Sequence, residues 1–484
     1  MINYRLILRV VAVILLVVIA FMLTSIAWAL LDGENGTTRA FLLTALVVAV
    51  PAVLFLLIGV RPEGEVSTRD GFLMVALGWL AASLAGALPF YLSGTIPSFA
   101  DAFFETMSGF TTTGASILTD IEALPRSMLF WRSLTHWLGG MGIIVLAVAI
   151  FPILGIGGLQ LIKAEAPGPS VDRLTPKITE TAKILWLTYV ILSVTETVLL
   201  MTAGLNLFDA LTHTFGTMAT GGFSPRSASV GHYNSAYVDG IITTFMVLAG
   251  INFVLYFKLV TGRFASLLRD TELRVYLLIF VLSSLAIAIG LHGDRFASFG
   301  ESMRYATFQA ASILTTTGYA TDDFALWPVF PQALLFFLMF IGGCSGSTGG
   351  GIKVIRVVTL IKQGWNEMRF LVYPTGVFRI RINREVLRKN IVYAISGFVI
   401  LYLAILLLTT LVVAFSGQDI LTSLTTALAT LGNIGPGFGR IGPTLNYAFY
   451  PSWLKVFLSV IMMLGRLEIY TVLVLVTPRF WRLQ

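Results

Sequence analysis

The chain has 484 residues, of which 56% are apolar and only 12% charged, with a formal net charge of +7. A soluble protein of this length needs a larger charged exterior, so the composition excludes that class and indicates a polytopic membrane protein. The single cysteine, Cys344, excludes an internal disulfide and a cysteine-based metal cluster.

The N-terminal region, residues 1–68, predicts two membrane spans, at residues 6–31 and 39–60, since a span needs about 20 apolar residues. After Arg61-Pro62-Glu63-Gly64 the pattern changes. Four units follow, each with a span, a short helix, a glycine-containing segment and a second span. We expect an all-α fold in which these units, residues 69–162, 163–270, 271–388 and 389–484, stand in a pseudo-fourfold arrangement.

Within the units, unit one runs from about residue 71 to residue 158, and the later spans are predicted at residues 184–203, 238–260, 273–291, 331–361, 391–415 and 453–476. The short helices are predicted at residues 99–110, 207–218, 301–314 and 419–429. They are too short to cross, and such re-entrant backbone is tolerated at membrane depth only where protein buries it or water is near. The C-terminal end of each helix favours a cation.

A glycine-centred segment follows each short helix. The four segments read Thr112-Thr113-Gly114-Ala115, Thr220-Gly221-Gly222-Phe223, Thr316-Thr317-Gly318-Tyr319 and Asn433-Ile434-Gly435-Pro436. Glycine at the third place permits an unusual φ without steric cost. Four such segments in one membrane chain indicate a ring of backbone carbonyl oxygens that replaces the water shell of K+.

Basic residues are distributed unevenly between the two sides of the predicted topology. Arg5, Arg9, the cluster from Lys353 to Lys389 and Arg479 lie on one side, whereas few basic residues lie on the other. Lys and Arg are retained in the cytoplasm during insertion, so both termini are expected there and the four glycine segments toward the outside. The positive charge therefore indicates a lipid bilayer and not a nucleic acid partner.

The glycine-rich stretch from Gly342 to Gly351 interrupts the second span of unit three. Irregular backbone at this depth must be buried or line the pore. Two interpretations remain open, a packing kink and a gate, and the gate is favoured because a hinge-rich segment can move. A phosphate-binding loop is rejected, because Ile352 separates Gly351 from Lys353 and breaks the required spacing.

Arg466 lies inside the last predicted span, where an ionisable residue is expected to face the pore or a partner. The alternative is a structural ion pair with Glu468 or Glu196. Arg466 and Glu468 are two residues apart, so they do not face each other on one helix. We therefore favour a role for Arg466 at the pore.

These features together resemble the superfamily of potassium transporters that includes the Trk, Ktr and HKT proteins. The two extra N-terminal spans, the string Gly342 to Lys353 and the ending Gly465-Arg466-Leu467-Glu468-Ile469-Tyr470 are similar to the TrkH family, the membrane subunits of bacterial Trk systems. The resemblance implies that the four glycine segments form the K+ filter. It also implies an intramembrane gate that contains Gly346, Ser347, Thr348, Gly349, Gly350, Lys353 and Arg466.

The resemblance further implies uptake of K+ across the bacterial inner membrane by a homodimer. Its gate would be controlled by a TrkA-type cytoplasmic ring that binds NAD(H) and ATP or ADP, with no organic cofactor on this chain. The sequence departs from a tetrameric potassium channel, because most segments lack the last Gly of Thr-Val-Gly-Tyr-Gly and unit four begins with Asn433. We therefore expect selectivity for K+ and Rb+ over Na+ that is less sharp.

Three rival functions differ in mechanism. An H+- or Na+-coupled K+ symporter would share the fold, but the spans offer few titratable groups for a proton path. A membrane-embedded enzyme would need His136, Glu196 or Glu468 to converge in one pocket, and no clustered motif supports this. An inverted-repeat anion transporter would need units of opposite orientation, whereas these units face the same way.

Overall fold

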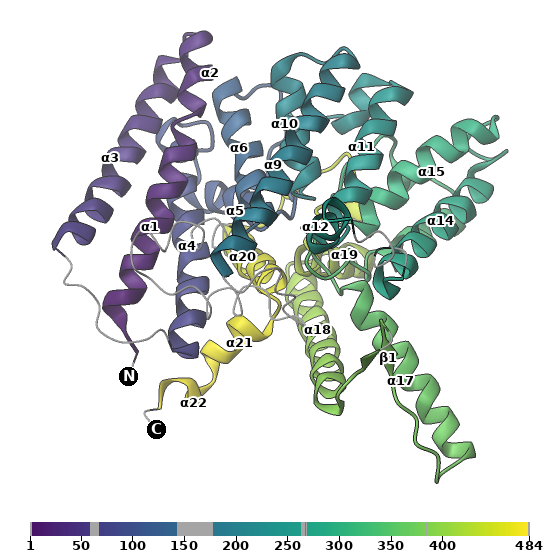
Figure 1. Ribbon diagram of the computed structural model, residues 1–484. Helices are drawn as coiled ribbons and strands as arrows, with labels where there is room; N and C mark the ends of the chain where they lie inside the picture. Colours follow the sequence, from purple (N-terminus) through teal and green to yellow (C-terminus); the bar gives the residue numbers. More distant parts are fainter. Residues whose placement is uncertain are drawn as a thin grey trace.

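The computed structural model describes residues 2–58, 67–142, 178–262, 267, 269–383 and 385–482. The predicted end of the second span of unit one and the predicted boundary at residues 162 and 163 lie outside these ranges. The regular secondary structure of the described chain is almost entirely helical, as Figure 1 shows. Its one sheet within these ranges is an antiparallel pair, β1 (Arg381–Ile382) and β2 (Glu385–Val386), in which Arg381 is opposite Val386.

The N-terminal region forms α1 (Tyr4–Met22), α2 (Ser25–Leu31) and α3 (Asn35–Ile58). Asn3 begins α1, and its side-chain oxygen accepts a hydrogen bond from the backbone N–H of Leu6 at 3.1 Å. The stretch Tyr4–Leu31 and the stretch Asn35–Leu57 are each long and apolar enough to cross a membrane. These stretches coincide with the two predicted N-terminal spans.

Each of the four units begins with a long helix followed by a short one. The long helices are α4 (Thr68–Leu92), α9 (Ile178–Thr202), α14 (Thr271–Leu291) and α18 (Lys389–Phe415). The short helices are α5 (Phe99–Phe110), α10 (Leu207–Met218), α15 (Phe299–Leu314) and α19 (Ile420–Leu431). Every short helix begins and ends within two residues of its predicted bounds, so this part of the prediction is confirmed.

The second helix of each unit is shorter or broken. These segments are α6 (Arg126–Gly140), α11 (Ala236–Ala249) with α12 (Phe253–Val260), α16 (Val329–Leu338) with α17 (Val354–Val372), and α20 (Ser452–Arg466) with α21 (Tyr470–Val476) and α22 (Pro478–Trp481). Among the described residues, six helices qualify as spans by length and composition, or seven if the bent pair α11 and α12 is one span. The chain is thus a multi-pass membrane protein.

Two of the predicted continuous spans are wrong. The span predicted at residues 238–260 bends by 94° between α11 and α12, because Asn252 begins a new helix by accepting a hydrogen bond from the N–H of Val254. The span predicted at residues 453–476 breaks after Arg466, where Glu468 and Ile469 have positive φ values of 56° and 50°. The glycine-rich break between α16 and α17 was predicted.

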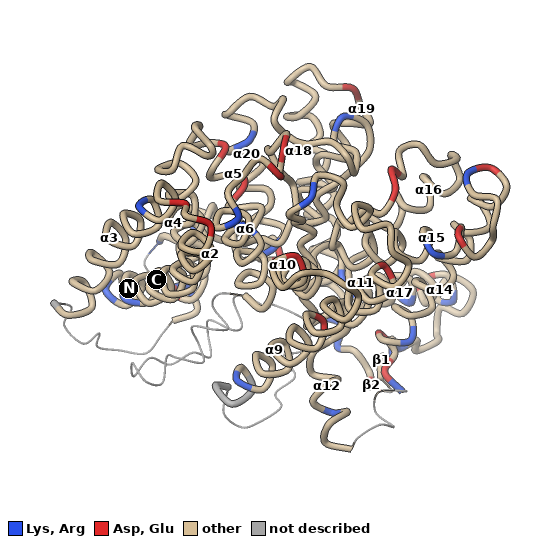
Figure 2. Tube along the Cα trace, turned by 90° about the horizontal axis from the view of Figure 1, so that it is seen from above, with Lys and Arg blue, Asp and Glu red and all other residues tan. Residues whose placement is uncertain are grey.

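The units pack against one another in a cyclic order. Each long helix packs on the short helix of its own unit. The second helix then reaches the short helix of the next unit, so that α6 packs on α10, α11 on α15 and α20 on α5. Between units three and four, Gly350 in the glycine-rich break lies against the end of α19 at Gly432. Figure 2, viewed from above, shows the few charged residues along this otherwise uncharged bundle.

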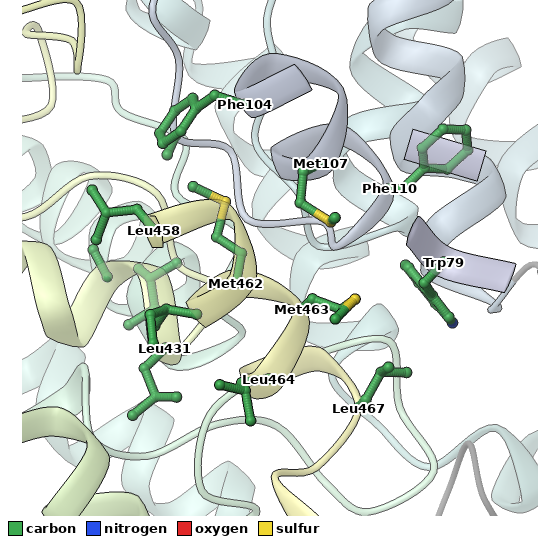
Figure 3. Close-up of a cluster of buried hydrophobic side chains, with 14 of the residues drawn as sticks. Trp79, Phe104, Met107, Phe110, Leu431, Leu458, Met462, Met463, Leu464 and Leu467 are labelled. Carbon is green, nitrogen blue, oxygen red and sulfur yellow. The ribbon is translucent and has the colours of Figure 1, made fainter. Parts of the chain in front are cut away.

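A cluster of buried side chains joins units one and four. Trp79 of α4, Phe104 and Met107 of α5, and Met462 and Met463 of α20 interlock there, as Figure 3 shows. Inside a membrane, close packing of this kind supplies the stabilisation that expulsion of water supplies elsewhere. The cluster holds α5 and α20 together and so fixes the start of the first glycine segment.

Both ends of the chain lie at the same edge of the molecule (Figure 1). The backbone N–H of Asn3 donates to Asp70 at 2.9 Å, and the Arg69 guanidinium donates to the carbonyl oxygen of Arg482 at 3.0 Å. The two termini therefore meet the start of α4, which is the arrangement that an even number of crossings produces.

Candidate functional site

The four short helices end in the same way. The first residue of each glycine segment is left-handed, with φ of 54° at Thr112, 53° at Thr220, 61° at Thr316 and 54° at Asn433. The backbone N–H of the residue after it donates a hydrogen bond to the carbonyl oxygen five residues earlier, which is the Schellman arrangement. These bonds join Thr113 to Ser108 (2.9 Å), Gly221 to Gly216 (2.8 Å), Thr317 to Ser312 (2.8 Å) and Ile434 to Ala429 (2.9 Å). Each segment therefore leaves its helix in the same direction.

The glycine at the third place of each segment also has a positive φ, as the sequence predicted. The values are 79° at Gly114, 81° at Gly222, 82° at Gly318 and 92° at Gly435. A side chain in this conformation would be strained even without neighbours. We call residues 112–115, 220–223, 316–319 and 433–436 the four ring segments.

The four ring segments contact one another in a closed order. A Cβ atom added to each third-place glycine would collide with the carbonyl oxygen at the second place of the next segment. The distances are 2.2 Å (Gly114 to Gly221), 2.1 Å (Gly222 to Thr317), 2.1 Å (Gly318 to Ile434) and 2.6 Å (Gly435 to Thr113). The fourth segment thus meets the first, and backbone carbonyl groups crowd every junction. A cavity of about 100 Å³ is lined by all four of these glycines.

Two tyrosine hydroxyl groups hold the outer side of the ring, that of Tyr319 across two units and that of Tyr447 within unit four. The Tyr319 hydroxyl donates to the carbonyl oxygen of His213 at 3.0 Å and to that of Phe223 at 3.2 Å. The Tyr447 hydroxyl donates to the carbonyl oxygen of Gly435 at 2.7 Å. Both tyrosines are buried, so these bonds form away from water and orient the backbone of segments two and four.

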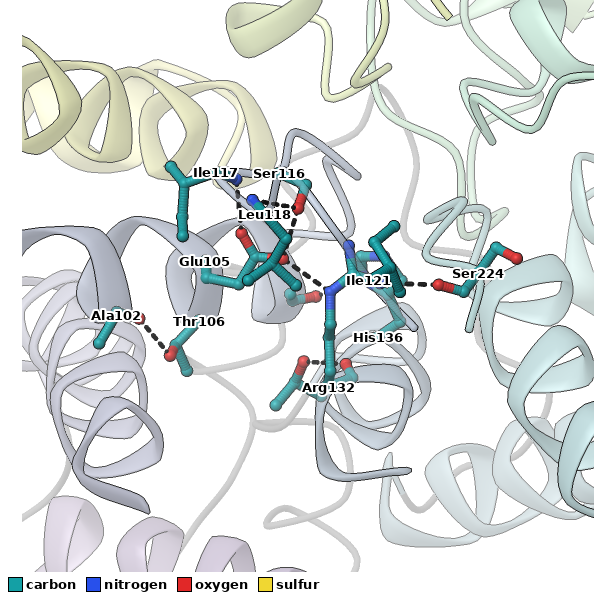
Figure 4. Close-up of polar contacts among 12 residues, drawn as sticks. Ala102, Glu105, Thr106, Ser116, Ile117, Leu118, Ile121, Arg132, His136 and Ser224 are labelled. Atoms are coloured by element: carbon teal, nitrogen blue, oxygen red, sulfur yellow. Dashed lines mark hydrogen bonds and ion pairs between the residues drawn. The ribbon is translucent and has the colours of Figure 1, made fainter. Parts of the chain in front are cut away.

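A buried ion pair lies behind the first two segments, and Figure 4 shows it. The Arg132 Nε donates to a Glu105 carboxylate oxygen at 2.6 Å, and both side chains are almost fully buried. The sequence analysis did not single out this pair. The sequence feature that could have identified the pair is a charged residue on each of two apolar helices, because such a residue in a membrane marks a functional position.

His136 packs behind segment two, and among the described contacts it acts as a core residue. Its ring stacks on Phe223 with centroids 4.0 Å apart, and its Nδ1 lies 2.7 Å from the carbonyl oxygen of Gly109. A Cβ atom on Gly221 would lie 2.5 Å from this ring. His136 therefore supports the backbone of the ring from behind.

The glycine-rich break forms a loop between α16 and α17, directly next to the start of the ring segments. The N–H of Gly350 donates to the Thr316 hydroxyl at 2.7 Å. A Cβ atom on Gly350 would lie 2.4 Å from the carbonyl oxygen of Gly432 and 2.9 Å from the Cβ of Asn433. The loop thus contacts segments three and four at the end opposite their third-place glycines.

Hydrogen bonds to several neighbouring elements hold this loop in place. Its described contacts include the N–H of Cys344 to the carbonyl oxygen of Gly250 at 2.8 Å and the N–H of Ser345 to the Glu272 carboxylate at 2.7 Å. Lys353, at the start of α17, donates through Nζ to the carbonyl oxygen of Gly349. The predicted gate residues therefore lie together against the inner end of the ring.

Arg466 connects this loop to the end of α6. Its guanidinium donates to the carbonyl oxygen of Thr348 at 2.6 Å and to those of Gly139 and Gly140 at 2.7 and 2.8 Å. Glu468 instead pairs with Arg356 of α17. The predicted alternative, an ion pair of Arg466 with Glu468, is therefore not the arrangement found.

A larger cavity, of about 760 Å³, lies beyond the loop. Arg466, Lys353 and residues 345–347 and 349–351 line one part of it, and β1, β2 and the start of α14 line another. The loop thus separates this cavity from the ring segments. The Glu196 and His136 side chains do not line it, and no group of His, Cys, Asp and Glu residues in the described chain is arranged to hold a metal ion.

Comparison with known proteins agrees with this architecture. The family model TrkH, described as a cation transport protein, matches residues 38–483. The chain belongs to the TrkH family. It is therefore a transporter and not an enzyme.

Individual relatives cover the whole chain. The Trk system potassium uptake protein TrkH of Escherichia coli K12 is 41% identical over 99% of this chain and 100% of its own length. The corresponding protein of Vibrio parahaemolyticus is 40% identical over the same shares. The crystal structure of the potassium transporter TrkH from Vibrio parahaemolyticus matches with a TM-score of 0.87 and 38% identity, covering 99% of this chain and 100% of that one. The expected TrkH fold is confirmed.

Proposed function

We propose that this chain carries K+ across the bacterial inner membrane through a pore at the centre of the four ring segments. The observation that carries the proposal is the closed order of contacts, in which each third-place glycine meets a carbonyl oxygen of the next segment. Carbonyl oxygens in a ring can replace the water shell of a cation. The names of the relatives, which are potassium uptake proteins, support K+ as the ion.

In this proposal all sixteen residues of the ring segments form the filter. The short helices direct their negative C-terminal ends toward it, which favours a cation over an anion. The third-place glycines are required because any larger residue would push neighbouring segments apart. The four segments differ in sequence, so the filter should select K+ and Rb+ over Na+ less sharply than four identical strands would.

The proposed gate is the loop containing residues 346–350, together with Lys353 and Arg466. Its support is the position of the loop between the ring and the larger cavity, and the bonds from Arg466 to the loop and to α6. Loss of the bond to Thr348 would free the loop to leave the inner end of the ring.

The Trk systems named among the relatives suggest a partner for the gate. We infer a homodimer whose loop is moved by a TrkA-type cytoplasmic ring that binds NAD(H) and ATP or ADP. Both termini and the basic cluster from Lys353 to Lys389 would face the cytoplasm, where such a ring could bind. The shared edge of the two termini supports this orientation.

The test is uptake of Rb+ by liposomes that contain the purified protein. We expect the native protein to prefer K+ and Rb+ over Na+ as competitors, and Gly318→Ser to lose this preference. Gly204→Ser is the matched control, because Gly204 also has a positive φ of 94° but no heavy atom lies within 4 Å of an added Cβ. Equal selectivity in the two variants would contradict the proposed filter.

A reversal potential separates the pore from the alternative, an H+- or Na+-coupled symporter on the same fold. A pore predicts that the potential follows the K+ gradient alone. A shift with the H+ or Na+ gradient at constant K+ would favour coupled transport.

A further inference from the structure

Each short helix carries a buried polar side chain at the same distance, nine residues, before the third-place glycine of its ring segment. These residues are Glu105, His213, Gln309 and Thr426. Two of them bond to the chain directly after the ring segment, Glu105 to Ser116 and Ile117 and His213 to Ser224, and Gln309 bonds to the carbonyl oxygen of Tyr319, the last residue of segment three. The position therefore serves to hold the exit of a ring segment.

Only unit one places an ion pair at this position. One Glu105 carboxylate oxygen accepts from Arg132 Nε at 2.6 Å and from the Ser116 hydroxyl at 2.9 Å, and the other accepts from the N–H of Ile117 at 2.9 Å. Ser116 and Ile117 directly follow segment one. Charge-assisted bonds of this kind are stronger than those between neutral groups.

Arg132 extends the contact to the next unit. Its Nη1 donates to the carbonyl oxygen of Ser224 at 3.0 Å, and its guanidinium lies 3.5 Å from the centroid of the Phe223 ring. Phe223 is the last residue of segment two, and His136 stacks on it. The two charged side chains thus connect the outer ends of segments one and two.

We propose that Glu105 and Arg132 are positioning residues that set the ion selectivity of the ring. The inference rests on the proposed function. The added-Cβ distance of 2.2 Å between Gly114 and Gly221 shows how closely these two segments meet. The residues that directly follow segments one and two are both bonded to this ion pair. The separation between the two segments therefore stays constant while ions pass. Without the pair, the first two segments can separate, and the ring discriminates less well between ions of different radius.

The test measures competition of Na+ with Rb+ uptake in liposomes. Removal of one charge would leave its partner buried and unpaired, so the main variant is the double change Glu105→Gln with Arg132→Gln. The pair Asp239 and Arg304, which joins α11 to α15 at 2.7 Å through the same atom types, gives the control Asp239→Asn with Arg304→Gln. A selectivity ratio does not depend on how much folded protein is present.

We expect the first double variant to lose about tenfold in its preference for Rb+ over Na+, a change that the loss of one charge-assisted hydrogen bond can produce. The control double variant should keep the native ratio. Arg132→Lys retains the charge but cannot reach both Glu105 and Ser224, so it should show a smaller loss in the same direction. If the double variant fails to fold, the Rb+ to Na+ ratio of Arg132→Lys tests the proposal instead.

A native ratio in the folded double variant, or in Arg132→Lys, would overturn the positioning role. An equal loss in the control double variant would also overturn it, because the loss would then follow from removing any ion pair beside a short helix. A native protein that does not distinguish Rb+ from Na+ would instead refute the proposed function, and the inference with it.

Discussion

The two ends of the ring are built differently. The outer end is held by a buried ion pair, by tyrosine hydroxyl groups and by backbone contacts at every junction. The inner end is covered by the glycine-rich loop. The N–H of Gly350 in this loop donates to the Thr316 hydroxyl, and Arg466 donates to the carbonyl oxygen of Thr348. A dense set of directional bonds keeps one geometry, whereas a loop joined to the ring segments by the Gly350–Thr316 bond can leave them at smaller cost. The contrast supports the proposal that the outer end selects the ion and the inner end carries the gate.

The largest expected effect is at the outer end, from Gly222→Ala. An added Cβ would lie 2.1 Å from the carbonyl oxygen of Thr317, so the backbone must move. We expect a loss of Rb+ uptake of about a hundredfold, corresponding to about 3 kcal/mol. Gly435→Ala should lose less, because its added Cβ would lie 2.6 Å from the oxygen of Thr113. Uptake by Gly222→Ala equal to that of Gly204→Ala would contradict the account.

At the inner end, Arg466→Ala should raise Rb+ uptake measured without any partner protein. The change removes three bonds to carbonyl oxygens, and bonds to charged groups contribute about 1.5–3 kcal/mol each. We expect at least about a tenfold increase. Arg440→Ala, at an exposed position on the outer side, should have no effect. Unchanged or lower uptake in Arg466→Ala would refute the assignment of this residue to the gate.

A smaller effect is expected from Thr316→Val. This change removes the hydroxyl that accepts from Gly350, a bond that contributes about 1 kcal/mol. Uptake should rise about fivefold. Thr220→Val is the matched control, since the Thr220 hydroxyl bonds to its own neighbour, Ala219. The same increase in both variants would show that the loop contact is not the cause.

The smallest effect concerns the short helices alone. Asp419 begins α19 and accepts a hydrogen bond from the N–H of Thr422 at 2.9 Å, so Asp419→Ala should lower the free energy of unfolding by about 1 kcal/mol. Ser298 begins α15 but makes no such bond, so Ser298→Ala should change stability less. Thermal unfolding in detergent measures both. A larger shift for Ser298→Ala would contradict the role of the cap.

The sequence predicted the parts of the fold that depend on local pattern. The short helices follow from apolar stretches too short to cross a membrane, and the positive φ at Gly114 follows from the absence of a side chain. The breaks at Asn252 and Glu468 were missed, because each lies within a stretch that is apolar overall, and composition indicates neither the cap that Asn252 provides nor the positive φ at Glu468.

Side-chain partners far apart in the chain were also beyond prediction. The contact of Arg466 with Gly139 joins units four and one, and that of Arg132 with Ser224 joins units one and two. Spacing along one helix cannot indicate such pairs. Arg466 was nevertheless identified as a candidate pore residue, because a charge within a membrane span needs a partner.

Deletion of Gly346 to Gly350 tests the central claim, that selection and gating occupy opposite ends of the ring. The measurement is Rb+ uptake by liposomes, with and without competing Na+, for the native protein and the deletion variant. The account predicts faster uptake with an unchanged preference for Rb+ over Na+, because the outer contacts remain. Faster uptake with a lost preference, or no change in uptake, would contradict it.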